Sequence, residues 1–537
     1  MKRRIASFLL CVRPLPLIVV VSVLCQAQAP PTERDIDATV WNENRLIARP
    51  QDFNIEIYLE NRDAKSVVQG NAYWVGRVRI DKGAPSVAEF PSSLGRSSAA
   101  SRTSRIVPAG FVSMIFPDLA GPDQDYYEWK YGGEQISGSV RCWVFDLKPK
   151  EATAYGAFVG RVLVAEADQM IVRYDGTFMS NPRKPSPYLH FISVRAKSGL
   201  DGQWFPWNVF INEKDLARPI NGSRELRARV VTWGFQRQAL EEQAVAELQA
   251  EGTIRGGLEQ SNTVRDPHEF ERAVEQMIVA WMTAQGLLAR SGQTETGLRS
   301  VAAGLVKKNN LVCPEIQVRL LLTTPLEDFT IGCTAVISKE ALNVASDDAV
   351  ASLLLAPLVA HILLNRPTKP LYADMLQADV HQVLKKLSFA RTAEDIEEDD
   401  KKGVELLVNS QSQSNLARMG SFLRSAAEHC GHMPALFLQP RLGNPVPACD
   451  ARRPIMQLIR LAPRKPDGLP AFSLGSRSVL DPVNDTVQLF APSPEQEPFQ
   501  LLSLDVNPRQ FGETPAPDPV LPPDVLPRRR AVPPIKW

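Results

Sequence analysis

The residues that could hold a metal ion gather in the C-terminal half of the chain. His429 and His432 lie three residues apart in the segment AEHCGHMP, with Cys430 between them. Imidazole and thiolate groups are ligands that zinc accepts, and His361 is the other histidine that could join them. The spacing matches no standard zinc module, and the segment also fits the end of a helix stopped by glycine and proline. We therefore expect no bound metal, with His361, His429 and His432 as the ligands if one is present.

Other kinds of catalytic pattern are missing from the sequence. No serine lies in a Gly-x-Ser-x-Gly motif, and no glycine-rich loop of the phosphate-binding type occurs. His361 lies in the apolar segment LLLAPLVAHILLNRP, where a packing role is the simplest interpretation. The sequence thus predicts neither a nucleophile nor a cofactor.

The first 29 residues have the pattern of a secretory signal. Basic residues precede the apolar segment 15–24, which is too short to span a bilayer comfortably. Ala27-Gln28-Ala29 then supplies the small-x-small pattern that signal peptidase cleaves. We expect residues 1–29 to be removed and the mature protein to be periplasmic or extracellular, without a membrane span.

Charge and cysteine content narrow the function further. Removal of the four basic residues of the signal leaves 57 of the 61 basic residues against 60 acidic ones, a net charge of about −3. Nucleic-acid binding normally requires a basic surface, so none is expected. Cys313–Cys333 and Cys430–Cys449 could form disulfides in an oxidising compartment, or the cysteines could be small buried side chains.

Residues 30–235 are rich in short alternating segments. A helix is predicted near residues 37–48, and polar turns separate the strands that follow it. Strands are predicted over residues 54–61, 71–80, 137–147, 156–168, 170–178, 188–196 and 204–212. Their regular spacing favours one large antiparallel sheet or a partly open barrel.

The rest of the chain changes character twice. Residues 236–261 favour a helical linker, and residues 262–462 combine predicted helices with a pair of strands at 315–324 and 329–338. Residues 463–537 contain proline every few positions and predict a disordered or polyproline-II tail. The fold class is therefore α+β, with a β-rich domain, a helix-dominated domain and a proline-rich tail.

The order of elements between residues 265 and 460 resembles the zinc metallopeptidases of the HtpX and CAAX-prenyl-protease type, which include BepA. In that family a His-Glu-x-x-His helix supplies two zinc ligands and the general base. In the matching segment LLLAPLVAHILLNRP, Pro357 stands at the first histidine and Leu358 at the glutamate, and only His361 remains. Proline cannot ligate zinc, and Pro357 is also expected to kink or interrupt the helix, at a cost of about 3 kcal/mol.

A second part of the resemblance concerns the third zinc ligand. The family carries a Glu-x-x-x-Asp segment on a later helix, and its match IEEDDKKGVELL puts Ile396 at the ligand and Asp400 at the supporting aspartate. The segment TTPLEDFTIGCTAVIS resembles the one that lines the substrate edge, with Phe329 matching. The resemblance therefore implies a zincin-like domain that binds peptides but has lost its zinc and its catalysis.

The N-terminal half resembles the LolA-type carriers that sort outer-membrane lipoproteins. The segments that carry this resemblance are ENRLIARPQDFNIEIYLEN, VGRVLVAEADQMIVRYDGTF and LHFISVRAKSGLDGQWFPWNVFIN. It implies an unclosed barrel whose apolar face accepts acyl chains. Trp204, Trp207 and Phe210 on the N-terminal half, with Phe329 on the C-terminal half, are the predicted ligand-binding residues.

Three functions remain open at this stage. The first is a non-catalytic envelope protein that binds a lipid, a lipoprotein or an extended peptide. The second is a zinc metalloendopeptidase of envelope protein quality control, which would need ligands other than Pro357, Leu358 and Ile396. The third is a structural envelope protein without a ligand, whose proline-rich tail is a spacer or docking arm.

Overall fold

The fold is that of a computed structural model, which describes most of the chain between residues 30 and 489. The described residues are 30–49, 51–63, 68–81, 84–89, 108–117, 121–137, 140–152, 154–181, 189–197, 203–213, 225–235, 267–289, 291–311, 315–343, 345, 347–364, 389–430, 438–447, 450, 452–462, 478–481 and 486–489. The predicted signal peptide and the predicted linker helix lie outside them.

The N-terminal half is built on one antiparallel sheet of ten strands, named here the N-terminal sheet. The strands are β1 (Gln51–Arg62), β2 (Val68–Asp81), β3 (Ala84–Glu89), β4 (Tyr127–Ser137), β5 (Val140–Pro149), β6 (Phe158–Ala165), β7 (Met170–Phe178), β8 (Phe191–Lys197), β9 (Trp204–Glu213) and β10 (Glu225–Trp233). Their order is β3-β2-β1-β10-β9-β8-β7-β6-β5-β4, so β10 returns beside β1. The predicted large antiparallel sheet is confirmed, whereas β3, β4 and β10 were not predicted.

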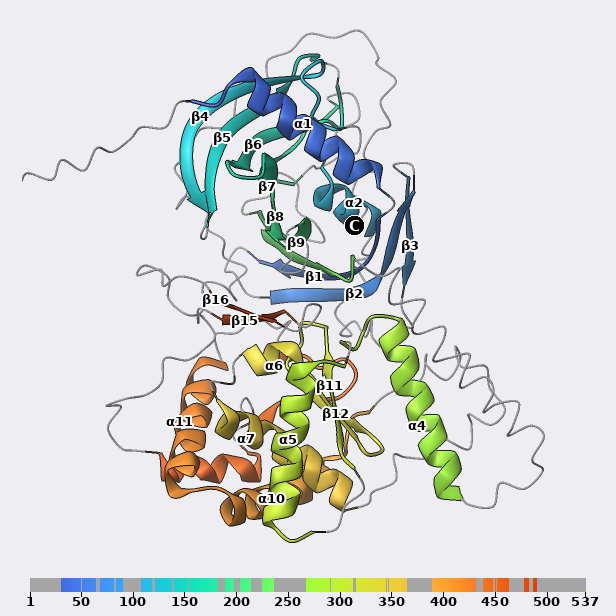
Figure 1. The fold of residues 1–537 in the computed structure, drawn as a ribbon, viewed down its shortest axis with the longest axis vertical. Coiled ribbons are helices and arrows are strands. Elements are labelled where there is room, and N and C mark those ends of the chain that lie inside the picture. The colour runs from blue at the N-terminus through green and yellow to red at the C-terminus, as the bar shows by residue number, and fades with distance from the viewer. Residues whose placement is uncertain are drawn as a thin grey trace, which may run out of the picture.

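The N-terminal sheet curves around two helices, α1 (Glu33–Ala48) and α2 (Pro108–Ile115) (Figure 1). All residues of α2 from Gly110 to Ile115 are buried, and Phe111 belongs to the apolar core that strands β1 to β10 share. The strands approach closely where Gly160 lies opposite Gly176, since a Cβ atom on Gly160 would lie 2.4 Å from a carbonyl oxygen of β7. Glycine is therefore required at this point of the curve.

Helix α1 is fixed across the open side of the curve by a buried ion pair. Glu43 accepts hydrogen bonds from the guanidinium of Arg195, at 3.0 Å for Nη2, and from the hydroxyl of Tyr174, also at 3.0 Å. Both carboxylate oxygens are thereby paired, which a charge without access to water requires. The helix begins four residues earlier than predicted because Asp35 accepts a hydrogen bond from the backbone N–H of Thr32 in a capping box.

The C-terminal half combines helices with a four-stranded sheet, named here the C-terminal sheet. Its helices are α4 (Pro267–Ala284), α5 (Gln293–Lys308), α6 (Lys339–Asn343), α7 (Asp348–Leu363), α10 (Ala393–Ser410), α11 (Gln413–Cys430) and the 3-10 helix η3 (Pro454–Leu461). Its strands are β11 (Gln317–Leu321), β12 (Glu327–Ile331), β13 (Thr334–Ser338) and β14 (Asn444–Pro445), in the order β11-β13-β12-β14. The α+β class is confirmed, and α5 was not predicted.

The predicted strand over residues 329–338 is in fact two strands. Gly332 turns the chain between β12 and β13 with a φ of +54°, a conformation that favours glycine. β11 therefore pairs with β13 in parallel and not with β12. The prediction of one strand pair was wrong because the turn is too short to break the apolar pattern.

Helix α7 passes through Pro357 without interruption. The side chain of Asp347 accepts a hydrogen bond from Val350 N at its start, and every residue from Ala349 to His361 is buried. Gly403 of α10 lies against this point, because a Cβ atom there would lie 3.2 Å from the nitrogen of Pro357. The expected interruption was wrong, since packing on all sides replaces the hydrogen bond that proline cannot make.

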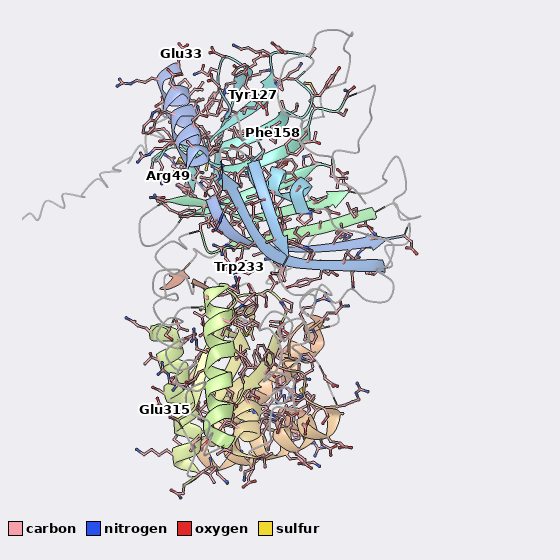
Figure 2. All side chains as sticks on the ribbon, turned by 90° about the vertical axis from the view of Figure 1, so that its right-hand side faces the viewer. Glu33, Arg49, Tyr127, Phe158, Trp233 and Glu315 are labelled. Carbon is pink, nitrogen blue, oxygen red and sulfur yellow. The ribbon has the colours of Figure 1, made fainter. Side chains whose placement is uncertain are left out.

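The two halves share a buried interface. Tyr58, Tyr73, Val75, Val231 and Trp233 of the N-terminal sheet belong to the same apolar core as the C-terminal elements. Trp233 faces this interface (Figure 2), and its indole N–H donates to Gly286 O at 2.7 Å. The N-terminal sheet is therefore supported on one face by the C-terminal half.

The described part of the predicted tail contains two short strands, β15 (Ser478–Asp481) and β16 (Thr486–Leu489), which pair antiparallel. The prediction of a disordered tail therefore does not apply to these eight residues. Among the described residues, no helix is both long and apolar enough to cross a bilayer.

Candidate functional site

The positions that resemble a peptidase centre lie in a buried ionic network. Nδ1 of His361 on α7 lies 2.9 Å from Oδ2 of Asp399 on α10, and His361 is 9% exposed. The same oxygen accepts a hydrogen bond from Arg391 Nη1 at 3.2 Å. Arg391 also forms an ion pair with Asp328 of β12. His361 is thus buried, as the packing interpretation predicted, but it is hydrogen-bonded as well.

The supporting aspartate of the resemblance has a structural partner. Asp400 is fully buried, and its two oxygens accept hydrogen bonds from Arg453 Nη2 at 2.6 Å and Nε at 2.9 Å. Two parallel bonds of this kind give a strong and directional pair. This pair fixes α10 to the start of η3, so Asp400 holds the fold together.

The residues at the zinc-ligand positions do not fit a metal. Pro357 and Leu358 are buried on α7 without a donor atom, and Ile396 is half-buried on α10. Among the described side chains, no three His, Cys, Asp or Glu residues come together to hold a metal ion. His429 lies on α11, but its side chain and all of His432 lie outside the described residues.

Phe329 lies in the core of the C-terminal half and not on a binding surface. It is fully buried, and its ring stacks on Phe389 at a centroid distance of 4.7 Å. β14 pairs with β12 next to it, with Glu327 opposite Pro445. The prediction that Phe329 binds a ligand is therefore corrected, because the edge on which it lies is already occupied.

A buried carboxylate holds β14 in place. Oε2 of Glu327 accepts three backbone hydrogen bonds, from Arg441 and Leu442 at 2.8 Å and from Gly443 at 3.0 Å. Burial raises the pKa of Glu327, although these three bonds act in the opposite direction. The other edge of the sheet is covered too, because Ala289 N donates to Leu320 O of β11 at 2.8 Å.

The three predicted ligand-binding residues of β9 do not form one site. Trp204 packs in a small cluster with Cys142 and donates its indole N–H to Asp168 at 2.9 Å. Phe210 lies under the guanidinium of Arg229, at 5.9 Å from the ring centroid. Trp207 is half-buried, and no contact joins it to the other two rings among the described side chains. Their proximity in sequence was misleading, since they have separate partners.

An aromatic surface that was not predicted lies on β4 and β5. Tyr127, Trp129 and Tyr131 alternate along β4, and their burial falls from 1% exposed through half-buried to 36% exposed. Phe145 of β5 contacts two of them, at ring-centroid distances of 5.4 Å for Trp129 and 5.8 Å for Tyr131. Trp143 of β5, half-buried, packs against the same core. We name Trp129, Tyr131, Trp143 and Phe145 the aromatic end.

The aromatic end continues the core of the curved sheet towards solvent. Helix α1 packs on β7, and α2 packs on β3, β8 and β9, so both helices lie towards the other strands. Figure 2 labels Tyr127 and Phe158, which lie deeper, where the Tyr127 hydroxyl accepts a hydrogen bond from Phe158 N at 3.2 Å. The signal in the sequence was the period-two alternation of Tyr127, Trp129 and Tyr131.

The cysteines add one observation. Cys142 is buried, and burial raises the pKa of its thiol to about 11. Such a thiol is a poor nucleophile at neutral pH. The predicted pairs cannot be described, because Cys313 and Cys449 lie outside the described residues.

Comparison with known proteins gives matches among solved structures alone. No protein-family model and no curated protein matches the chain. A DUF1329 family protein from Desulfovibrio piger is similar at 14% identity and a TM-score of 0.21, over 38% of this chain and 92% of that one.

Two further solved structures give similar values. One is a putative outer membrane lipoprotein-sorting protein domain from Vibrio parahaemolyticus, at 11% identity and a TM-score of 0.21, over 37% of this chain and 90% of that one. The other is a LolA superfamily protein from Nitrosomonas europaea, at 8% identity and a TM-score of 0.20, over 37% and 91%. The N-terminal part of the chain is thus similar to LolA-like structures at low identity, and the peptidase resemblance finds no support in these matches.

Proposed function

We propose that this protein is an exported envelope protein that binds an acyl chain of a lipid or lipoprotein at the aromatic end. The observation that carries the proposal is the gradual exposure of aromatic rings along β4, from a buried Tyr127 to a 36% exposed Tyr131. An apolar core that opens to solvent in this way offers flat aromatic surface to a hydrocarbon chain. Each methylene group buried there contributes about 0.8 kcal/mol.

The test compares an N-palmitoylated tetrapeptide with the same peptide without the acyl chain, by calorimetric titration of the purified protein. We expect the acylated peptide alone to bind. Trp143→Ala is expected to weaken binding about tenfold, because truncation of a contacting tryptophan costs roughly 1–2 kcal/mol. The matched control is Trp41→Ala on α1, whose ring is 60% exposed and lies beneath Arg45. Equal binding of both peptides, or equal loss in both variants, contradicts the proposal.

The C-terminal half is proposed to act without catalysis. Pro357 and Leu358 cannot replace a zinc ligand and a general base, and Nδ1 of His361 is hydrogen-bonded to Asp399. In this proposal the half supports the N-terminal sheet through their shared core. Metal analysis of the purified protein after dialysis against zinc tests it. We expect far less than one zinc ion per chain, and a stoichiometric zinc ion would restore the peptidase hypothesis.

A further inference from the structure

The two edges of the N-terminal sheet differ. β3 forms one edge, has six residues including Pro85, and lies beside α2. β4 forms the other edge, has eleven residues, and within the described residues is hydrogen-bonded to β5 alone. An edge strand presents a row of backbone N–H and C=O groups that another strand can pair with. β4 is therefore the strand at which an added strand would find partners.

A bulge divides β4 into two parts. Tyr131 pairs with Phe145 and Gly133 with Val144, so Gly132 is the extra residue. Gly133 has a φ of +113°, which glycine adopts more easily than any other residue. Regular pairing at this edge therefore ends at the bulge, and the part from Gly133 to Ser137 is the free regular segment.

The side chains of this part have a definite pattern. Glu134 lies opposite Trp143, and Ile136 opposite Arg141, so Glu134 and Ile136 lie on one face. Ile136 is 67% exposed and is the most exposed large apolar side chain among the described residues. On the other face, Gly133, Gln135 and Ser137 are small or uncharged.

The charge around this part is acidic. Glu134 is exposed, and partial desolvation together with the carboxylates of Glu134 and Glu166 raises the pKa of Tyr131. Arg141 on β5 is the basic residue opposite Ile136. A strand added outside β4 would meet Glu134 and Ile136 first, and a basic side chain beside Glu134 gives a favourable cross-strand pair.

We propose that the β4 edge, from Gly133 to Ser137, binds an extended segment of another protein as an added strand, with a basic and an apolar residue two positions apart. The backbone pairing supplies the affinity, and the contacts with Glu134 and Ile136 supply the selectivity. This inference does not depend on the acyl ligand at the aromatic end.

The probe is a synthetic peptide, acetyl-Thr-Lys-Thr-Val-Thr-Lys-Thr-amide, titrated against the full protein by calorimetry. Its lysines and its valine lie two positions apart, so they face one side of a strand in either direction. We expect binding, with increased protection of the amides of residues 133–137 in hydrogen exchange. A probe with methylated backbone nitrogens at alternate residues is expected not to bind, because it cannot pair. Binding without protection of these amides overturns the proposal.

Two variants separate the contacts. Ile136→Ser is expected to weaken binding about fivefold, while Val408→Ser on α10, which replaces a 51% exposed valine, leaves it unchanged. Glu134→Lys is expected to reverse the preference, so that a probe with glutamate in place of lysine binds better. The same selectivity in both proteins contradicts the assigned partner chemistry.

A membrane surface is the competing occupant, and phosphatidylcholine vesicles test it in parallel. If wild-type protein binds the vesicles, loses them on Ile136→Ser and binds no peptide, this edge contacts lipid and the proposal is overturned. If Trp143→Ala abolishes acyl binding but leaves peptide binding intact, the two sites are separate. Failure of the acyl test with intact peptide binding would contradict the proposed function alone.

Discussion

The N-terminal and C-terminal sheets treat their edges in opposite ways. Both edges of the C-terminal sheet are covered by the chain itself, by β14 on β12 and by residues 287–289 on β11. The N-terminal sheet leaves the eleven-residue β4 without an outer strand among the described residues. Peptide recognition by strand addition is therefore expected at β4, although the sequence resemblance suggested β12.

Buried charges follow the same division. Asp328, Arg391, Asp399 and His361 form a connected network beside the C-terminal sheet, and all are at most 9% exposed. The aromatic end of the N-terminal sheet is uncharged and partly exposed. A buried ion pair adds little net stability but fixes geometry, since removing one partner leaves an unpaired charge. The comparison indicates that the C-terminal charges hold β12, α7 and α10 in place.

The largest expected effect is that of Arg391→Ala. It removes the cation shared by Asp328 and Asp399 and leaves two fully buried carboxylates without it. We expect the free energy of unfolding, measured by urea denaturation, to fall by about 3–5 kcal/mol. The control Arg418→Ala breaks a half-exposed pair with Asp347 and is expected to cost less than about 1 kcal/mol. Similar losses in both variants would mean that the network does not hold the C-terminal sheet.

The sequence predicted best where one local pattern determines an element. The alternation of apolar residues gave most strands of the N-terminal sheet, and the apolar segment around Pro357 gave α7. It predicted contacts poorly, because His361 and Asp399 are 38 residues apart and nothing between them indicates the pair. The aromatic end was missed because β4 contains a bulge at Gly132 that breaks the alternation.

A second prediction concerns the cover on β12. Gly443 lies so close that a Cβ atom would be 2.3 Å from Asp328 O and 2.7 Å from the ring of Phe329. Gly443→Ala is therefore expected to displace β14, to lower the free energy of unfolding by about 1–3 kcal/mol, and to speed amide exchange in β12. The control Gly304→Ala on α5 meets nothing within 4 Å and is expected to stabilise the helix by about 0.5–1 kcal/mol. Unchanged exchange in β12 would show that β14 is not needed to cover it.

The smallest expected effect tests the junction at which the two sheets meet. Glu56 of β1 is buried and accepts hydrogen bonds from Thr324 N at 3.1 Å and from the Tyr73 hydroxyl at 2.6 Å. Burial raises the pKa of Glu56, and the bonds from Thr324 and Tyr73 oppose this rise. The folded state thus holds the proton more tightly than the unfolded state, so stability is greatest below the ordinary glutamate pKa and falls as pH rises through the folded pKa.

Urea denaturation at a series of pH values above 4.5 measures this slope. For one proton it is at most about 1.4 kcal/mol per pH unit, and Glu56→Gln is expected to reduce it because the glutamine does not ionise. Thr324→Val removes a hydroxyl donor that lowers the pKa of Glu56, so the fall in stability should extend to higher pH. If the slope is the same in all three proteins, Glu56 does not couple protonation to the contact between the two halves. The junction would then depend on its apolar contacts, around Tyr58 and Trp233, rather than on its one buried carboxylate bridge.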